Sequence, residues 1–511
     1  MGWQETAPIA LEKYMAAISE FNGEIRVASR IVDYLSSGLY KSPAACLKEL
    51  INNSYDADAT RVDVFVKPDA DRIMIEDNGQ GMDRADFERD FSLISDSHKR
   101  DKGDVTPMGR PKIGKIGIGF IAANEICDEM QIVSTKKGSS ELLNVTIHFD
   151  LMRQDPNERK RDATTLAKAD YIGTVTGTDK ASHFTYVYLK RIRGEAKAIL
   201  AGVSTSAFAT GKKSLYGLKP ESVFPQLQDK SLLAWAMFDA YSLNVLEVAL
   251  NIPIRYYDRW LPSQLRSKVR DIEDYVASLN FSVFFDGTEL RKPVIFPPGG
   301  KPLISRFEYS GKNVSAKGYF YAQHGAIKPQ ELQGLLIRIR NSAVGEYDRS
   351  FLGFSPNIGR LFQTWISAEI LAGDQLEDAM NIDRRTLRDA HPAYVELRQA
   401  IHRDLANLIK RVRVNIYETQ KSKRSIQRAS DIESRIIKVA SSEIAQLAPA
   451  AASDMRRVWR RLAGNELDQD KLLRKFSVDE LYAIVIETAK EVLTPKQLNE
   501  FVTRLTDRLQ Q

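Results

Sequence analysis

The segment LKELINNSYDADA carries polar side chains at spacings that suit chemistry on one face of a helix. Glu49, Asn53 and Asp56 lie three or four residues apart, so in a helix they share a face, while the leucines and isoleucine between them fall on another. Two carboxylates and an amide, with no basic residue among them, can bind a cation, a water molecule or a ligand rich in hydrogen-bond donors. We therefore expect a polar site on this helix.

The elements around this segment can be predicted from caps and alternation. Ser42 is a suitable N-cap and Pro43 suits the first helical position, so we expect the helix to begin there and to end near Ala59. RVDVFVK and RIMIE have the alternation of half-buried strands, with a turn between them. This hairpin leads into DNGQGM, where Asp77 follows the second strand and two glycines allow close approach of the backbone to a ligand.

A long polar segment, residues 83–112, follows this turn and has two interpretations, a surface loop or an active-site lid. It leads into GRPKIGKIGIGFIAANEI, in which three glycines precede a helix that we expect to begin near Phe120. Backbone amides converge in such a segment, which suits an anion, and Lys115 adds positive charge. The glycines are Gly114, Gly117 and Gly119.

Two commoner nucleotide motifs are imitated here and can be excluded. GRPKIGKI has the spacing of a phosphate-binding P-loop, but Ile116 stands where a Ser or Thr would bind magnesium. GIGFIA imitates the dinucleotide-binding fingerprint, but no hydrophobic strand precedes it and no βαβ unit surrounds it. Neither motif is therefore assigned.

The order of the motifs resembles the GHKL superfamily, which includes gyrase, the large heat-shock chaperone, histidine kinases and MutL. ELINNSYDADAT resembles its N box, IEDNGQGM its adenine-binding turn, and the polar segment and glycine run its lid and phosphate-binding glycines. The resemblance implies an α/β fold, the GHKL or Bergerat α/β sandwich, that binds ATP with Mg. A histidine kinase is disfavoured, because no phosphoacceptor helix precedes the N box.

The resemblance assigns roles to individual residues. It implies that Glu49 is the general base for the water that attacks the γ-phosphate, and that Asn53 is the magnesium ligand. Asp77 matches the carboxylate that accepts a hydrogen bond from the amino group of adenine. The residues that would line the nucleotide site are Asp56, Ala57, Gly79, Gly81, Met82, Gly114, Gly117, Gly119 and Phe120. Lys99 or Lys115 would pair with phosphate charge, or would belong to a solvated lid.

One family element departs from the usual pattern. The superfamily closes its nucleotide site with a Gly-Thr that opens a strand, and here Gly177 and Thr178 lie well ahead of the strand FTYVYLK. Ser182 and His183 lie nearer to the expected position. Either Thr178 serves after a local insertion or the contact is altered.

The later part of the chain resembles the second, transducer domain of the chaperone, MutL and MORC-like branches. In NIDRRTL, Arg384 matches an arginine that reaches the γ-phosphate, and the alternative is a salt bridge with Asp383 or Asp389. We expect a GHKL ATP-binding domain at 1–262, a transducer-like (ribosomal S5-like) domain at 263–424 and a C-terminal helical domain at 425–511. Basic residues cluster between 401 and 461, and they suit a phosphate backbone, a solvated face or a dimer seam.

Composition sets further bounds. The 511 residues are 43% hydrophobic and 27% charged, which is ordinary for several globular domains, and a net charge of +6 permits nucleic acid without arguing for it. Two cysteines and no targeting or membrane-spanning segment favour the cytoplasm. We expect a magnesium-dependent ATPase, hydrolysing ATP to drive a homodimeric clamp on a protein client or on double-stranded DNA in repair or anti-phage defence. The alternative is a nucleotide-binding interaction module with little turnover.

Overall fold

The computed structural model describes residues 17–23, 42–66, 71–91, 105–114, 119–152, 170–202, 212–296, 302–354, 360–381, 384–414 and 478–510. The chain divides into two compact units, Met1–Ile416 and Tyr417–Gln511, which are described separately. The basic residues between 415 and 461, for which the sequence analysis left three roles open, lie outside the described ranges.

The first sheet of the larger unit contains nine described strands in the order β1-β6-β5-β4-β7-β3-β2-β8-β9. Neighbouring strands are antiparallel except β2 and β8, which are parallel. The strands are β1 (Ala17–Gly23), β2 (Arg61–Phe65), β3 (Arg72–Asp77), β4 (Cys127–Thr135), β5 (Glu141–His148), β6 (Tyr171–Gly177), β7 (Phe184–Ile192), β8 (Ser282–Phe285) and β9 (Thr288–Glu289). The sheet thus takes strands from beyond residue 262, and the division into three domains stays a prediction.

Helices pack against this sheet to form an α/β sandwich, as expected. The helix α3 (Pro43–Asp56) shares a hydrophobic core with the strands and contacts α10 (Ala240–Asn251) and α8 (Gly194–Ala201). The predicted start of α3 is confirmed: Pro43 is at the first turn, and the Ser42 hydroxyl accepts a hydrogen bond from the Ala45 amide at 3.3 Å. Shorter helices are α4 (Arg84–Phe91), α6 (Phe149–Met152) and the 3-10 helix η1 (Gly119–Glu125).

The helix expected near Phe120 is present as η1, a 3-10 helix rather than an α-helix. The strand β4 begins at Cys127, which leaves no room for a longer helix. Any anion binding in this region therefore depends on individual backbone amides and not on a long helix dipole.

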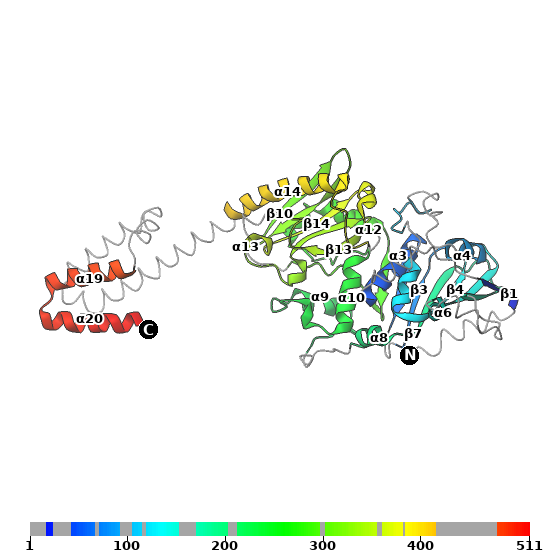
Figure 1. The fold of residues 1–511 in the computed structure, drawn as a ribbon, viewed down its shortest axis with the longest axis horizontal. Coiled ribbons are helices and arrows are strands. Elements are labelled where there is room, and N and C mark those ends of the chain that lie inside the picture. The colour runs from blue at the N-terminus through cyan, green and yellow to red at the C-terminus, as the bar shows by residue number, and fades with distance from the viewer. Residues whose placement is uncertain are drawn as a thin grey trace. The chain divides into compact units, whose positions relative to one another are not determined.

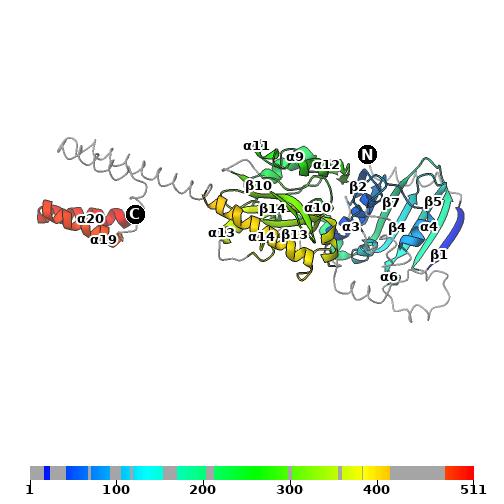
Figure 2. The same ribbon diagram turned by 90° about the horizontal axis from the view of Figure 1, so that it is seen from above.

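The second sheet of the larger unit has five described strands in the order β10-β11-β14-β12-β13. They are β10 (Leu303–Ser310), β11 (Ser315–Ala322), β12 (Gly334–Ile339), β13 (Ser342–Asp348) and β14 (Ile366–Ala372). Both faces of this sheet are covered, because alternate residues of β11 belong to different hydrophobic cores. Tyr319 and Tyr321 are buried in one core, and Phe320 and Ala322 are buried in the other. Figure 2 shows α14 (Pro392–Val412) on one face and α9 (Pro220–Gln228), α11 (Ser263–Arg266) and α12 (Arg270–Ser278) on the other.

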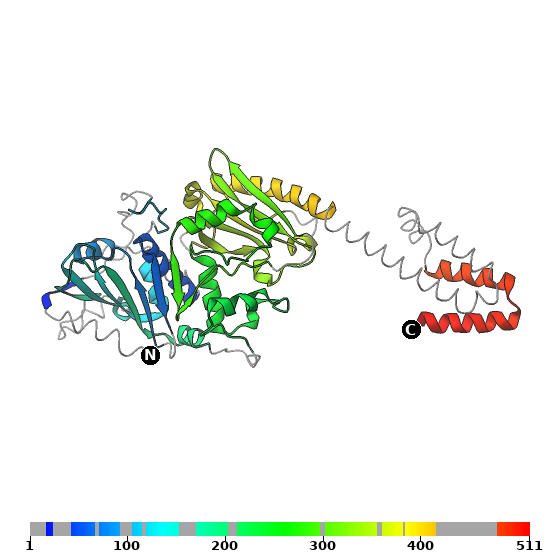
Figure 3. The ribbon, with the colours of Figure 1, turned by 180° about the vertical axis from the view of Figure 1, so that it is seen from behind.

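The helix α3 lies between the two sheets, as Figures 1 and 3 show from opposite sides. Side chains from β12 and β13, together with Lys292 from the segment after β9, cap the C-terminus of α10. Arg338 donates to the Leu250 carbonyl at 2.8 Å, Ser342 to Asn251 at 3.3 Å and Lys292 to Ile252 at 3.4 Å. Arg338 is itself fully buried and paired with Glu369 at 2.6 Å.

The remaining described elements connect these layers. They are the 3-10 helices η2 (Trp235–Met237), η3 (Gln330–Leu332) and η5 (Asp374–Ala379) and the short helix α13 (Arg360–Gln363). The smaller unit contains α19 (Val478–Val492) and α20 (Pro495–Gln510), which contact each other.

Candidate functional site

The polar face of α3 is the base of the candidate site. Glu49 is buried with 5% of its surface exposed, while Asn53 and Asp56 are half-buried. The apolar residues Leu47, Leu50 and Ile51 are buried in the core of the first sheet. The two expected faces of the helix are therefore both present.

Arg384 lies next to Glu49. Its guanidinium Nη1 is 3.5 Å from Glu49 Oε2, and its Nη2 donates to the Ile113 carbonyl at 2.5 Å. The backbone of Arg384 is in the left-handed region, with φ of 51°, which is uncommon for a residue with a side chain. The described contacts thus connect Arg384 to the N box and to the start of the glycine run, while residue 383 lies outside the described ranges.

Lys48 makes a second connection between α3 and the second sheet. Its ammonium group donates to the Ala343 carbonyl on β13 at 2.8 Å. Burial lowers the pKa of Lys48 to about 8, partly offset by the neighbouring Glu49 carboxylate. Two consecutive side chains of α3 therefore reach beyond the first sheet, Lys48 to β13 and Glu49 to Arg384 in the segment after η5.

Asp56 binds the start of the glycine run. Its carboxylate accepts hydrogen bonds from the amides of Ile113 and Gly114, each at 2.7 Å. A Cβ atom at Gly114 would lie 3.0 Å from Asp56 Oδ2 and 3.9 Å from Asn53 Oδ1, so this glycine allows close approach to the polar face of α3. The structure therefore places Asp56 against the glycine run, and the Gly114 amide is already paired.

Asp77 is buried at the end of β3, with 5% of its surface exposed. It accepts hydrogen bonds from the Ser54 hydroxyl at 2.8 Å and the Gly79 amide at 2.9 Å. Burial raises the pKa of Asp77 to about 6, and these two hydrogen bonds partly oppose the shift. Ser54, one position after Asn53 in the N box, is thus a contributor that the sequence analysis did not single out.

The turn after Asp77 requires its glycines. A Cβ atom at Gly79 would lie 2.7 Å from the Ala57 carbonyl oxygen, and one at Gly81 would lie 1.8 Å from the Thr135 carbonyl oxygen. Gly81 also has φ of 68°. The structure thus brings Ala57, Asp77, Gly79 and Gly81 together, and the turn is pressed between the end of α3 and the end of β4.

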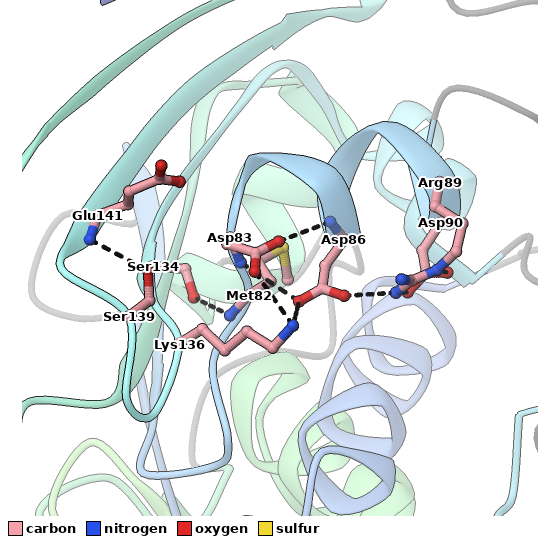
Figure 4. Close-up of polar contacts among 9 residues, drawn as sticks. All are labelled: Met82, Asp83, Asp86, Arg89, Asp90, Ser134, Lys136, Ser139 and Glu141. Atoms are coloured by element: carbon pink, nitrogen blue, oxygen red, sulfur yellow. Dashed lines mark hydrogen bonds and ion pairs between the residues drawn. The ribbon is translucent and has the colours of Figure 1, made fainter. Parts of the chain in front are cut away.

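Met82 immediately precedes the segment 83–112 that was expected to be a surface loop or a lid, and Figure 4 shows how this end of the segment is fixed. The Met82 amide donates to the Ser134 hydroxyl at 2.9 Å. The carboxylates of Asp83 and Asp86 both reach Lys136 after β4, at 3.1 and 2.7 Å. The start of α4 is therefore anchored to the first sheet by an amide and an ion-pair cluster.

Thr178 does not lie on a strand next to Asp77, so its expected role in closing the nucleotide site stays a prediction. It follows β6, and β5, β4 and β7 separate β6 from β3, a lateral distance of roughly 19 Å at the usual spacing of strands. Thr185 on β7 is instead paired in register with Asp77, and it is buried. Its hydroxyl lies 2.9 Å from that of Ser134. The sequence position of a Gly-Thr pair could not identify this residue, because the register of β7 decides it.

His183 contacts the turn after Asp77. The sequence analysis noted only that this residue lies near the position expected for the closing Gly-Thr pair. Its Nδ1 lies 2.7 Å from the Gly79 carbonyl oxygen and must donate in this hydrogen bond. Since the Gly79 amide binds Asp77, both polar groups of Gly79 have partners. No motif in the sequence indicated this contact.

The remaining predicted residues are only partly described. Lys99, Lys115 and Gly117 lie outside the described ranges, while the backbones of Gly119 and Phe120 open η1. Within the described ranges there is no group of three or more His, Cys, Asp or Glu that could bind a metal ion. The Asn53 amide beside the Glu49 carboxylate nevertheless fits magnesium held mainly by phosphate oxygens and water, which takes one or two protein ligands.

Comparison with known proteins agrees with this geometry. Residues 40–185 match the family model described as histidine kinase-, DNA gyrase B- and HSP90-like ATPase. These residues therefore belong to a GHKL-type ATPase domain, and they include the N box, the adenine-type turn and the glycine run.

Individual relatives match over 121 to 145 residues. The "Putative type II restriction enzyme HgiDII" of Herpetosiphon aurantiacus is 32% identical over 121 residues, which is 24% of this chain and 19% of that protein. The chaperone protein HtpG of Gluconobacter oxydans is 28% identical over 144 residues, which is 24% of this chain and 23% of that protein. HtpG of Bacillus subtilis is 28% identical over 145 residues with the same coverage. The matches thus span about a fifth to a quarter of these relatives.

None of the helices in the described ranges is both long enough and apolar enough to span a membrane.

Proposed function

We propose that this protein is a magnesium-dependent ATPase that couples ATP binding and hydrolysis to a clamp-like movement of the second sheet. The contact between Glu49 and Arg384 carries this proposal. A carboxylate suited to activate water and an arginine from a separate sheet region meet at the start of the glycine run. In this arrangement a γ-phosphate would be contacted by both parts of the larger unit.

The roles proposed for the site residues follow from their positions. Glu49 orients and deprotonates the attacking water, and it exchanges its pairing with Arg384 for that water when a phosphate draws the arginine away. Asp77 reads the adenine amino group, with Thr185 rather than Thr178 beside it. Asn53 would hold magnesium, whose chemistry is to neutralise charge on the phosphate oxygens.

Supporting observations for a chaperone-like or MORC-like machine are the HtpG relatives and the second sheet packed against the ATPase domain. We propose a cytoplasmic, ATP-dependent homodimer acting on a protein client. The pair α19 and α20 is the proposed region for self-association, since Val485, Val492 and Phe501 are exposed there.

A DNA-associated clamp in repair or anti-phage defence is the second candidate. It is favoured by the similarity to HgiDII, a putative type II restriction enzyme, and by a row of exposed basic residues on and after α14. These are Arg403, Lys410, Arg411 and Arg413. Such residues can bind a phosphate backbone with a strong dependence on salt.

The test is steady-state ATP hydrolysis at low salt, with and without long double-stranded DNA, using Glu49→Ala as the blank. We expect Glu49-dependent turnover that falls by roughly a hundred- to ten-thousandfold in the variant, while ATP binding is retained. Stimulation by DNA that fades as salt rises would favour the DNA clamp. Turnover indifferent to DNA would favour a protein client, and ATP binding without Glu49-dependent turnover would favour an interaction module.

A further inference from the structure

Arg340 occupies a strained position at the tip of the hairpin between β12 and β13. Ile339 pairs with Ser342, so Arg340 and Asn341 form a two-residue turn. Both have positive φ, 52° and 65°, as a type I′ turn requires, although such turns prefer Asn or Gly. A bulky residue in this conformation persists where surrounding contacts determine it, which is common at functional sites.

The contacts of Arg340 leave the second sheet. Its side chain is 2% exposed and pairs with Asp374 at 2.9 Å and Glu377 at 3.1 Å on η5. Its Nη1 also donates to the Lys112 carbonyl, in the segment that leads into the glycine run. Asn341 is fixed separately, because Lys292 donates to its side chain at 3.1 Å. The hairpin tip therefore has its own support, and the bond to Lys112 is an additional connection.

Arg340 and Arg384 act on neighbouring peptide groups. Arg340 binds the Lys112 carbonyl, and Arg384 binds the Ile113 carbonyl. On the opposite side of the same backbone, Asp56 accepts from the amides of Ile113 and Gly114. Two arginines from the second-sheet region thus hold the carbonyls, while α3 holds the amides.

The preceding residues are fixed to the first-sheet region instead. Arg110 is buried and donates to the carbonyls of Ala59 at 2.6 Å and Asn280 at 2.9 Å. From residue 112 on, the second-sheet region therefore adds its own contacts: its arginines bind the carbonyls of Lys112 and Ile113, while α3 still binds the amides of Ile113 and Gly114. A movement of the second sheet would therefore displace the backbone of Lys112 to Gly114 before the rest of the glycine run.

We propose that Arg340 is a positioning residue for the phosphate-binding glycines, setting the path of Lys112 to Gly114 through the Lys112 carbonyl. This inference rests on the proposed ATPase function. Arg340 contacts neither nucleotide nor water in this role, and it acts through the backbone that must approach the phosphates. The position of the second sheet thereby determines the geometry of the glycine run as well as that of Arg384.

The experiment compares the full-length protein with Arg340→Lys and Arg340→Ala. Lysine keeps a positive charge near Asp374 and Glu377 but loses the forked guanidinium that binds an acid and a carbonyl together. The matched control is Arg306→Ala, which removes an exposed arginine of the same sheet whose partner is Asp271. Thermal unfolding identifies any variant whose fold is lost.

The first measurement is amide hydrogen exchange without nucleotide. We expect peptides covering residues 105–114 to exchange roughly tenfold faster in both Arg340 variants, the effect of losing about one hydrogen bond. The control should match the wild type. Unchanged exchange in folded Arg340→Lys would overturn the proposal.

The second measurement is the kinetics of ATP hydrolysis. We expect kcat/KM to fall roughly ten- to hundredfold in Arg340→Lys, with ADP affinity changed less, because only the path of the phosphate-binding backbone is altered. If the wild-type protein hydrolyses ATP and Arg340→Lys has the same kcat/KM, the proposal is also overturned. A third outcome is that Arg340→Lys exchanges faster while the wild-type protein does not bind ATP. This outcome would support the contact between Arg340 and the Lys112 carbonyl and would refute the ATPase proposal.

Discussion

The carboxylate of Glu49 and the guanidinium of Arg384 lie 3.5 Å apart, although one belongs to α3 and the other to the segment after η5. This pair joins the ATPase domain to the second sheet at the point where water would be activated. Because Arg384 also binds the Ile113 carbonyl, its position depends on the glycine run as well.

Replacing Arg384 should separate catalysis from binding. We expect Arg384→Ala to lower kcat roughly a thousandfold, as for arginines that stabilise phosphoryl transfer, while ADP affinity stays within a small factor. The neighbouring Arg385, which pairs with Glu247 at 3.0 Å, provides the control in Arg385→Ala. Steady-state kinetics and ADP titration measure both effects. Equal losses of kcat in the two variants would contradict the proposed role of Arg384.

The raised pKa of Asp77 predicts a pH-dependent stability. Its pKa is about 6 in the fold, against an ordinary value of 3.8. A carboxyl group with a raised pKa contributes stability that is fully present below its unfolded pKa and is lost as pH rises through the folded pKa. Relative to Asp77→Asn, the wild type should therefore lose up to about 3 kcal/mol between about pH 4 and about pH 7. Urea unfolding of both proteins measures this difference, and parallel pH profiles would refute it.

His183 should support nucleotide affinity by fixing the Gly79 carbonyl. We expect His183→Ala to raise KM roughly tenfold, with a smaller change in kcat, because the adenine-type turn loses one hydrogen bond. His183→Asn keeps a side-chain N–H donor and should recover part of the affinity. A larger effect on kcat than on KM, with no recovery by asparagine, would assign His183 another role.

The two threonines provide a paired test of the closing contact. Thr185→Val removes the hydroxyl beside Ser134 and opposite Asp77, and we expect ATP affinity to fall roughly tenfold. Thr178→Val removes a buried hydroxyl that has no hydrogen-bond partner among the described residues, so affinity should be unchanged and stability equal or higher. Isothermal titration with ATP separates the two variants. A loss of affinity in Thr178→Val alone would restore the original expectation for Thr178.

Local sequence signals predicted the local parts of the site. The cap at Ser42, the helix with Glu49 and Asn53 and the strand leading to Asp77 follow from propensity and alternation, and the structure has all of them. Thr185 and His183 could not be assigned in the same way, since their places depend on the register of β7 against β3. Arg340 was missed because a hairpin tip carries no motif, and its partner Lys112 is remote in the sequence.

The side chains that cap the C-terminus of α10 connect the unfolding of the second sheet to that of the first. The carbonyls of Leu250 and Asn251 receive hydrogen bonds from Arg338 and Ser342 of the second sheet, so unfolding that sheet would remove these two partners from the end of α10. Since α10 packs on α3, that loss would spread to the helix that carries Glu49 and Asn53. We therefore expect the candidate site and the second sheet to unfold together, and an ATPase domain cut away at residue 262 would lack both β8 and β9 and this cap.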